Sequence, residues 1–280
     1  MTPAVAPPRR GRVAVTVSNP ELQGLDPAAR EAYGRFLLAM ADSELVIGHR
    51  HSEWTGFAPS AEEDVAFSSI AQDEMGHAHL YYALVTGASE DDAVDRLALD
   101  RGPRQMRHLP LLHAANGDWY FTIARHVYWD AWEDVLLSAA LWSKLPLLAS
   151  ASQRILNEEV YHEEHAAQWL ELLSSRRAPH ARLAAAMRRV VDVGGNPALR
   201  LDGLDVLGRL ELLPGHGDLA DGFAASLRRR LEHVGRWNPR ELNWVLENLD
   251  SRGPWPSPRG LRQLHDELTG MRRAHPGATW

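Results

Sequence analysis

The stretch Ala71-Gln72-Asp73-Glu74-Met75-Gly76-His77-Ala78-His79-Leu80 decides the fold of this chain. Glu74 and His77 are three residues apart, so in a helix both side chains leave the same face. Apolar residues recur on that face: Phe67, Ile70, Ala71, Ala78 and Tyr81. A carboxylate within an apolar stripe loses its hydration and persists only when it is paired, protonated or bound to a metal. The pair is therefore half of a candidate di-metal carboxylate site.

A second Glu-x-x-His pair lies in the stretch Asn157-Glu158-Glu159-Val160-Tyr161-His162-Glu163-Glu164-His165. Glu159 and His162 share a face with Ile155, whereas Glu158 has the charged Arg154 four residues before it. We therefore assign the inward position to Glu159 and keep Glu158 as the alternative.

Two further helical segments each carry one carboxylate in the middle of an apolar stripe, Glu44 and Glu133. Considered alone, Glu44 fits a solvated position at the edge of its stripe. In combination, the chain order is Glu, Glu-x-x-His, Glu, Glu-x-x-His, which is the ligand set of ferritin-like di-metal carboxylate bundles. The predicted metal ligands, which we also expect to be the catalytic residues, are Glu44, Glu74, His77, Glu133, Glu159 and His162.

The pattern predicts an all-α fold, a ferritin-like four-helix bundle with additional C-terminal helices. Asp26-Pro27 starts the first helix, a Ser60–Glu63 capping box starts the second, and Pro146 ends or kinks the third. The predicted helices span residues 26–51, 60–85, 117–145, 147–174, 179–193, 218–235 and 259–273, with a long irregular connection over 87–116. We expect an N-terminal arm (1–25) and one helical domain (26–280), comprising the core bundle (about 26–175) and a C-terminal extension (176–280).

The composition excludes several classes of function. The 280 residues carry a net charge of −7, which disfavours nucleic acid as a partner. The chain has no cysteine, so it can form neither disulfides nor thiolate or iron–sulfur sites of its own. The N-terminus has no signal-peptide pattern and no segment is apolar enough to span a membrane, so we expect a cytoplasmic protein.

The donor set indicates which metal the site would hold. Four carboxylates balance the charge of two divalent ions, and two imidazoles favour iron over harder cations. We therefore expect two iron ions, with manganese as an alternative. Asp73 and Asp130 are candidates to hydrogen-bond the ligand imidazoles.

The other histidines are expected at the surface or in supporting positions: His49, His51, His79, His126 and His165. The arginine-rich helix faces are expected to be solvated, with a phosphate-binding role as the alternative: Arg188, Arg189, Arg228, Arg229 and Arg230.

Over residues 28–280 the chain resembles the ferritin-like subunits of the phenylacetyl-coenzyme A ring 1,2-epoxidase, the PaaA and PaaC types. Segments of PaaC type are Ser52-Glu53-Trp54 with Ala58-Pro59, Phe121-Thr122-Ile123-Ala124-Arg125, Asp130-Ala131-Trp132, Tyr161-His162 and the C-terminal part from His265 to Pro276-Gly277-Ala278-Thr279-Trp280. Familiar PaaC subunits are structural partners that lack a complete ligand set. This chain departs from them, because its set is complete and Gln72-Asp73-Glu74-Met75-Gly76-His77 is similar to the PaaA motif.

The resemblance implies a di-iron oxygenase component that epoxidises the ring of an aryl-acyl-coenzyme A, in a complex with a second ferritin-like subunit and a flavin and iron–sulfur reductase. Homo- or hetero-oligomers are both compatible with it. The alternatives are a non-catalytic PaaC-like structural subunit and a stand-alone ferritin-like ferroxidase or peroxidase. The acyl group, the residues that hold coenzyme A and the stoichiometry of the complex stay open at this stage.

Overall fold

The computed structural model describes residues 24–87, 91–234, 236–250, 257–276 and 278. Within them the chain is built from helices and contains no strand, which confirms the predicted all-α class. No helix in this described part is long and apolar enough to cross a membrane. The predicted N-terminal arm lies outside the described residues except for its last two positions.

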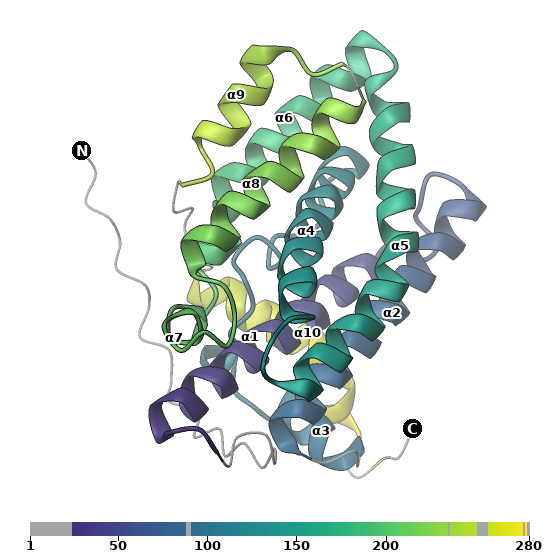
Figure 1. The fold of residues 1–280 in the computed structure, drawn as a ribbon. Helices are drawn as coiled ribbons and strands as arrows, with labels where there is room; N and C mark the ends of the chain where they lie inside the picture. Colours follow the sequence, from purple (N-terminus) through teal and green to yellow (C-terminus); the bar gives the residue numbers. More distant parts are fainter. Residues whose placement is uncertain (1–23, 88–90, 235, 251–256, 277, 279–280) are drawn as a thin grey trace.

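The first bundle helix begins where the sequence predicts. α1 (Pro27–Ser52) packs along α2 (Ala61–Thr86) as an antiparallel hairpin (Figure 1). The Asp26 carboxylate accepts hydrogen bonds from the backbone nitrogens of Ala28 and Ala29 at 2.8 and 2.9 Å. These bonds satisfy two of the amide groups that the first turn of a helix leaves without partners.

The start of α2 differs from the predicted capping box. The Ser60 hydroxyl accepts a hydrogen bond from the Glu63 backbone nitrogen at 3.3 Å, as expected. The Glu63 carboxylate, however, extends across the bundle to Nε2 of His165 at 2.7 Å. Gly87 ends the helix in the left-handed conformation (φ 64°) that glycine adopts without strain.

A long connection carries the chain to the second hairpin, as predicted for residues 87–116. It contains the short helix α3 (Asp91–Leu99) and the 3₁₀ turn η2 (Pro103–Gln105), and is otherwise irregular in its described residues. The second hairpin consists of α4 (Trp119–Ala140) and α5 (Pro146–Ser174). α4 ends five residues earlier than predicted, and Pro146 starts α5. The first position of a helix tolerates proline because its N–H has no partner within the helix.

Two helices of the C-terminal extension pack mainly on α4 of the second hairpin (Figure 1), a short helix contacts α1, and the last helix contacts η2 and α3 of the long connection. The three long helices of this part were predicted, whereas its two short helices, and α3 in the connection, were not, because such short helices show little periodicity. The elements are α6 (Arg177–Gly194), the 3₁₀ turn η3 (Pro197–Leu199), α7 (Leu204–Arg209), α8 (His216–His233), α9 (Pro239–Glu247) and α10 (Pro258–Ala274).

The expectation that the arginine faces are solvated is wrong at one position. Arg188, Arg189, Arg228 and Arg229 are exposed. The Arg230 side chain is only 18% exposed and forms an ion pair with Glu163 of α5. The Glu163 carboxylate draws it inward, and a partner on another helix is something that helical periodicity alone could not reveal.

A buried ion pair attaches the long connection to the first hairpin. The Asp42 carboxylate of α1 is fully buried and pairs with Arg101, which follows α3. It also accepts hydrogen bonds from the Tyr82 hydroxyl at 2.6 Å and the Arg107 backbone nitrogen at 2.6 Å. Burial alone would raise the pKa of Asp42, but the charge and hydrogen bonds of Arg101 outweigh it and hold that pKa below its ordinary value.

We predict that Asp42→Asn lowers the free energy of unfolding by about 3 kcal/mol, because it leaves the Arg101 charge buried without its partner. The lowered pKa means that the wild-type stabilisation is complete above the unfolded-state pKa, near 4, and declines as the pH falls through the folded value. Urea unfolding followed by circular dichroism from pH 7 to 3 measures both effects. The control is Glu31→Gln, which removes an exposed pair with Arg35; an equal loss in both variants would contradict the prediction.

Candidate metal centre

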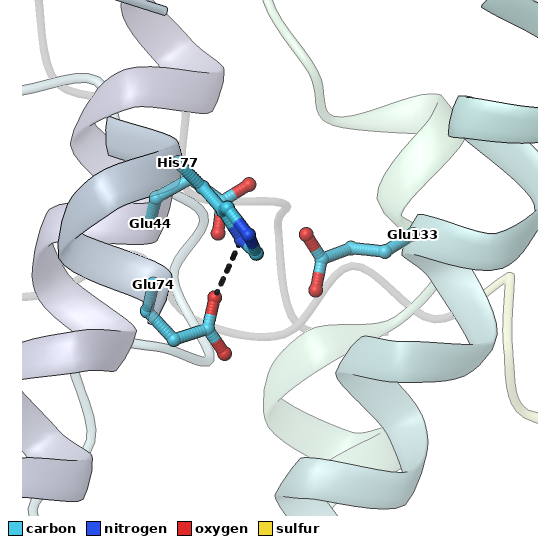
Figure 2. A group of neighbouring side chains, drawn as sticks. All are labelled: Glu44, Glu74, His77 and Glu133. Carbon is cyan, nitrogen blue, oxygen red and sulfur yellow. Dashed lines mark ion pairs between the residues drawn. The ribbon is translucent and has the colours of Figure 1, made fainter. Parts of the chain in front are cut away.

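Four of the predicted ligands converge in the middle of the bundle. Glu44 comes from α1, Glu74 and His77 come from α2, and Glu133 comes from α4, and their side chains point toward one another (Figure 2). A carboxylate oxygen or imidazole nitrogen of each lies within 4.8 Å of those of the other three. All four residues are 0% exposed. The solvated position considered for Glu44 is therefore wrong, since α4 covers that face of α1.

Close packing of α1 against α2 brings Glu44 and Glu74 together. A Cβ atom on Gly48 would lie 3.1 Å from the Glu74 Cβ and 3.1 Å from the Ala71 carbonyl oxygen. Those distances are shorter than ordinary van der Waals contact, so a side chain here would push the two helices apart. Gly48 thus sets the separation between the helices at the level of the candidate site.

Glu159 and His162 of α5 complete the group. Their donor atoms lie within 4.8 Å of one another and of Glu74, and a second set within that distance contains Glu159, Glu133 and Asp130. Glu159 is 3% exposed, whereas the Glu158 side chain is 35% exposed. The structure therefore places Glu159 inward, as predicted, and it gathers all six predicted residues around one buried space.

The donor atoms of this group have no hydrogen-bond partner among the residues that the structure describes. All eight oxygens of Glu44, Glu74, Glu133 and Glu159, and Nδ1 of His77 and of His162, are buried and unbonded. The two Nδ1 atoms lie 3.6 and 3.0 Å from Oε1 of Glu159 without hydrogen-bond geometry. Buried polar atoms are normally paired, and leaving so many unpaired would be very costly. This arrangement fits metal cations at the centre.

The outer nitrogens of the two imidazoles are held by carboxylates. Nε2 of His77 lies 2.8 Å from Glu158, and Nε2 of His162 lies 3.4 Å from Asp73. Each of these acids directly precedes the inward glutamate of its own helix and contacts the histidine of the other helix. Asp73 therefore has its predicted role, and Glu158, considered as an alternative ligand, supports His77 instead. Such contacts turn Nδ1 toward a metal and make it more basic.

Burial disfavours the ionised form of two carboxyl groups in this site. Burial raises the pKa of Glu44 well above its usual range, and the neighbouring Glu74 raises it further. Burial and the adjacent Glu159 have the same effect on the pKa of Glu133. Burial would lower the pKa of His162, but Glu159 outweighs it and raises that pKa to about 10. Bound divalent ions would stabilise the ionised carboxylates, because the positive charge favours their deprotonated form.

The remaining histidines divide into two sets. His49 and His79 are partly exposed, as expected. His51, His126 and His165 are buried, and their rings surround Phe67 at centroid distances of 5.1, 5.7 and 5.3 Å.

Asp130 does not contact a predicted ligand imidazole as the sequence suggested. Its Oδ1 lies 3.2 Å from Nδ1 of His126, four residues earlier on α4. The i, i+4 spacing of these two residues is the sequence signal that could have indicated this contact.

Residues 20–280 match the family described as "Phenylacetic acid catabolic protein", PaaA_PaaC. The chain is also similar to the C-type subunit of the 1,2-phenylacetyl-CoA epoxidase of Escherichia coli (strain K12), with 34% identity over 140 residues. That similarity covers 50% of this chain and 56% of the relative, so the match spans about half the length of each.

We predict that Glu158→Ala weakens metal binding by about 10- to 100-fold, because His77 loses the carboxylate that orients it. Metal affinity is measured by competition with a chromophoric chelator. Glu164→Ala, an exposed substitution on the same helix, is the control and should leave the affinity unchanged. Equal affinities for the Glu158 variant and the wild type would show that His77 needs no such support.

For the metal-free protein we predict that Glu133→Gln raises the melting temperature at pH 7.5 by about 2–4 °C, the shift expected for roughly 1 kcal/mol in a chain of this size. The pKa of Glu133 is raised in the folded state, so its destabilising effect grows as the pH rises above the ordinary value of 4.5. The gain should therefore shrink toward pH 4.5. Calorimetry with excess chelator measures it, and a variant less stable than the wild type at pH 7.5 would refute the prediction.

Proposed function

Because this chain belongs to the phenylacetic acid catabolic protein family, we propose that it is the di-iron oxygenase component of a multicomponent ring epoxidase acting on phenylacetyl-coenzyme A or a related aryl-acyl thioester. The observation that supports the proposal most is the set of buried, unpartnered donor atoms contributed by four glutamates and two histidines. The substrate is inferred from the name of the curated relative. We assign the protein to the cytoplasm, where acyl-coenzyme A thioesters are metabolised.

The residues that would hold the metal are the six that the sequence predicted. Glu44 and Glu133 would each contribute one carboxylate, and the two Glu-x-x-His pairs would contribute the rest. The mixture of carboxylates and imidazoles suits iron, and manganese is the alternative. When bound, two iron ions would supply the redox chemistry that the activation of dioxygen requires.

The protein's own residues provide charge balance, orientation and a dry site. Four carboxylates compensate four positive charges, and Glu158 and Asp73 hold the two imidazoles in place. The 0% exposure of Glu44, Glu74 and Glu133 keeps bulk water from the centre. Epoxidation consumes dioxygen, two electrons and two protons, and forms the epoxide and one water. The chain has no cysteine for an iron–sulfur cluster, so we expect a separate reductase to deliver the electrons.

A structural role within the same complex is the second candidate. The curated relative is a C-type subunit, and the family resemblance associates that type with a supporting role beside a second ferritin-like subunit. The complete donor set favours the catalytic role, because a structural subunit would gain little from burying four carboxylates at this cost. A stand-alone ferroxidase or peroxidase would instead purify without partner subunits.

We predict about two iron ions per chain in protein purified from iron-supplemented cells, in keeping with a two-metal carboxylate site. Glu74→Ala and His162→Ala should each lose most of this iron, because each removes a ligand from the centre. Elemental analysis measures the metal, and assays with the partner subunits and reductase measure phenylacetyl-coenzyme A turnover. Iron-free wild-type protein that still assembles with an active partner would establish the structural role.

A further inference from the structure

A separate cavity lies outside the carboxylate group, where α8 crosses the second hairpin. It has a volume of about 340 Å³, within the usual range of small-molecule sites. α4 lies between α5 and α8 (Figure 1), and residues of all three helices contribute to the walls. The lining residues are Val127, Ala166, Ala167, Leu170, Arg229, Arg230, His233 and Val234.

The cavity has an apolar floor and a basic wall. Val127, Ala166 and Leu170 form the floor and are each at most 2% exposed. The basic wall comes entirely from the end of α8, and no acidic side chain is among the lining residues. In a chain of net charge −7, a cavity lined by three basic groups and no acid is a distinct electrostatic environment.

Two of the basic groups are available to a ligand. Arg230 is engaged by Glu163, by Asp134 at 3.7 Å and by the Asp130 carbonyl oxygen at 3.4 Å. Arg229 and His233 are exposed and have no ion-pair partner in the described part of the chain. Basic residues are common in the last turn of a helix because they offset its dipole. That preference does not explain an apolar cavity beneath them.

We propose that this cavity binds a small organic carboxylate with an apolar body, such as an aryl- or alkylacetate. The apolar part would lie on Val127, Ala166 and Leu170, and the carboxylate would pair with Arg229 beside His233. Arginine suits this role because its guanidinium binds a carboxylate through two parallel hydrogen bonds. Val127 lies three residues before Asp130 on α4, and Ala166 lies four residues after His162 on α5. The cavity is therefore next to the carboxylate group but shares none of its donor atoms.

The test is calorimetric titration of the full chain with phenylacetate and, as the uncharged probe of the same shape, phenylacetamide. Phenylacetate should bind, and phenylacetamide should bind at least about tenfold more weakly, as expected when a charge-assisted hydrogen bond is lost. Arg229→Gln should weaken phenylacetate binding by a similar factor. Ala167→Trp should abolish it by filling the cavity. Because Arg229 and Ala167 are exposed, both variants should retain the wild-type circular dichroism spectrum.

Two controls separate this site from others. Arg228→Gln changes the neighbouring arginine, which pairs with Glu232 and does not line the cavity, so binding should be unchanged. Glu74→Ala should also leave binding unchanged, which separates this proposal from the metal centre. Absence of phenylacetate binding at millimolar concentration, or binding lost in Glu74→Ala and retained in Arg229→Gln, would overturn the proposal. A concentration-dependent dimer that Ala167→Trp disrupts, without phenylacetate binding, would assign the cavity to a second copy instead.

Discussion

The burial of four carboxyl groups between two helical hairpins is the constraint on which the rest of this structure depends. Burial raises the pKa of Glu44 and Glu133 well above the ordinary range. Without bound cations, the ionised forms of these two side chains therefore destabilise the core of the bundle. The same carboxylates would become favourable partners for two divalent ions. A fold that keeps this arrangement gives up stability at its centre for a metal-binding function, a trade-off typical of functional sites.

Contacts outside the donor atoms hold the two hairpins in register. Glu158 bonds His77 and Asp73 bonds His162, so each hairpin orients the imidazole of the other. Gly48 sets the distance between α1 and α2. The Asp42–Arg101 pair fastens the long connection to α1. The geometry of the candidate centre is therefore defined by contacts between elements distant in the sequence.

The curated relative of this chain is of the C type, and the chain itself gathers four glutamates and two histidines around one buried space. The cavity beside α8 is a second, chemically different environment at the outer side of α4. Its basic side chains favour anions, whereas the carboxylates at the centre of the bundle favour cations. Arg230 lines that cavity and donates to the Asp130 carbonyl oxygen, so the two environments are neighbours along α4.

The sequence by itself determined the helical class and the four bundle helices, because these follow from local periodicity: residues three or four apart share a helix face. It also predicted six metal donors, from the order Glu, Glu-x-x-His, Glu, Glu-x-x-His along these helices. It also favoured Glu159 over Glu158, since the apolar stripe is read along a single helix. The tertiary structure decided the burial of Glu44, the pairing of Glu158 with His77, the inward turn of Arg230, the histidines around Phe67 and the cavity beside α8. Each of these depends on a contact between helices far apart in the chain, and the periodicity of one helix carries no information about the side chains that another helix brings against it.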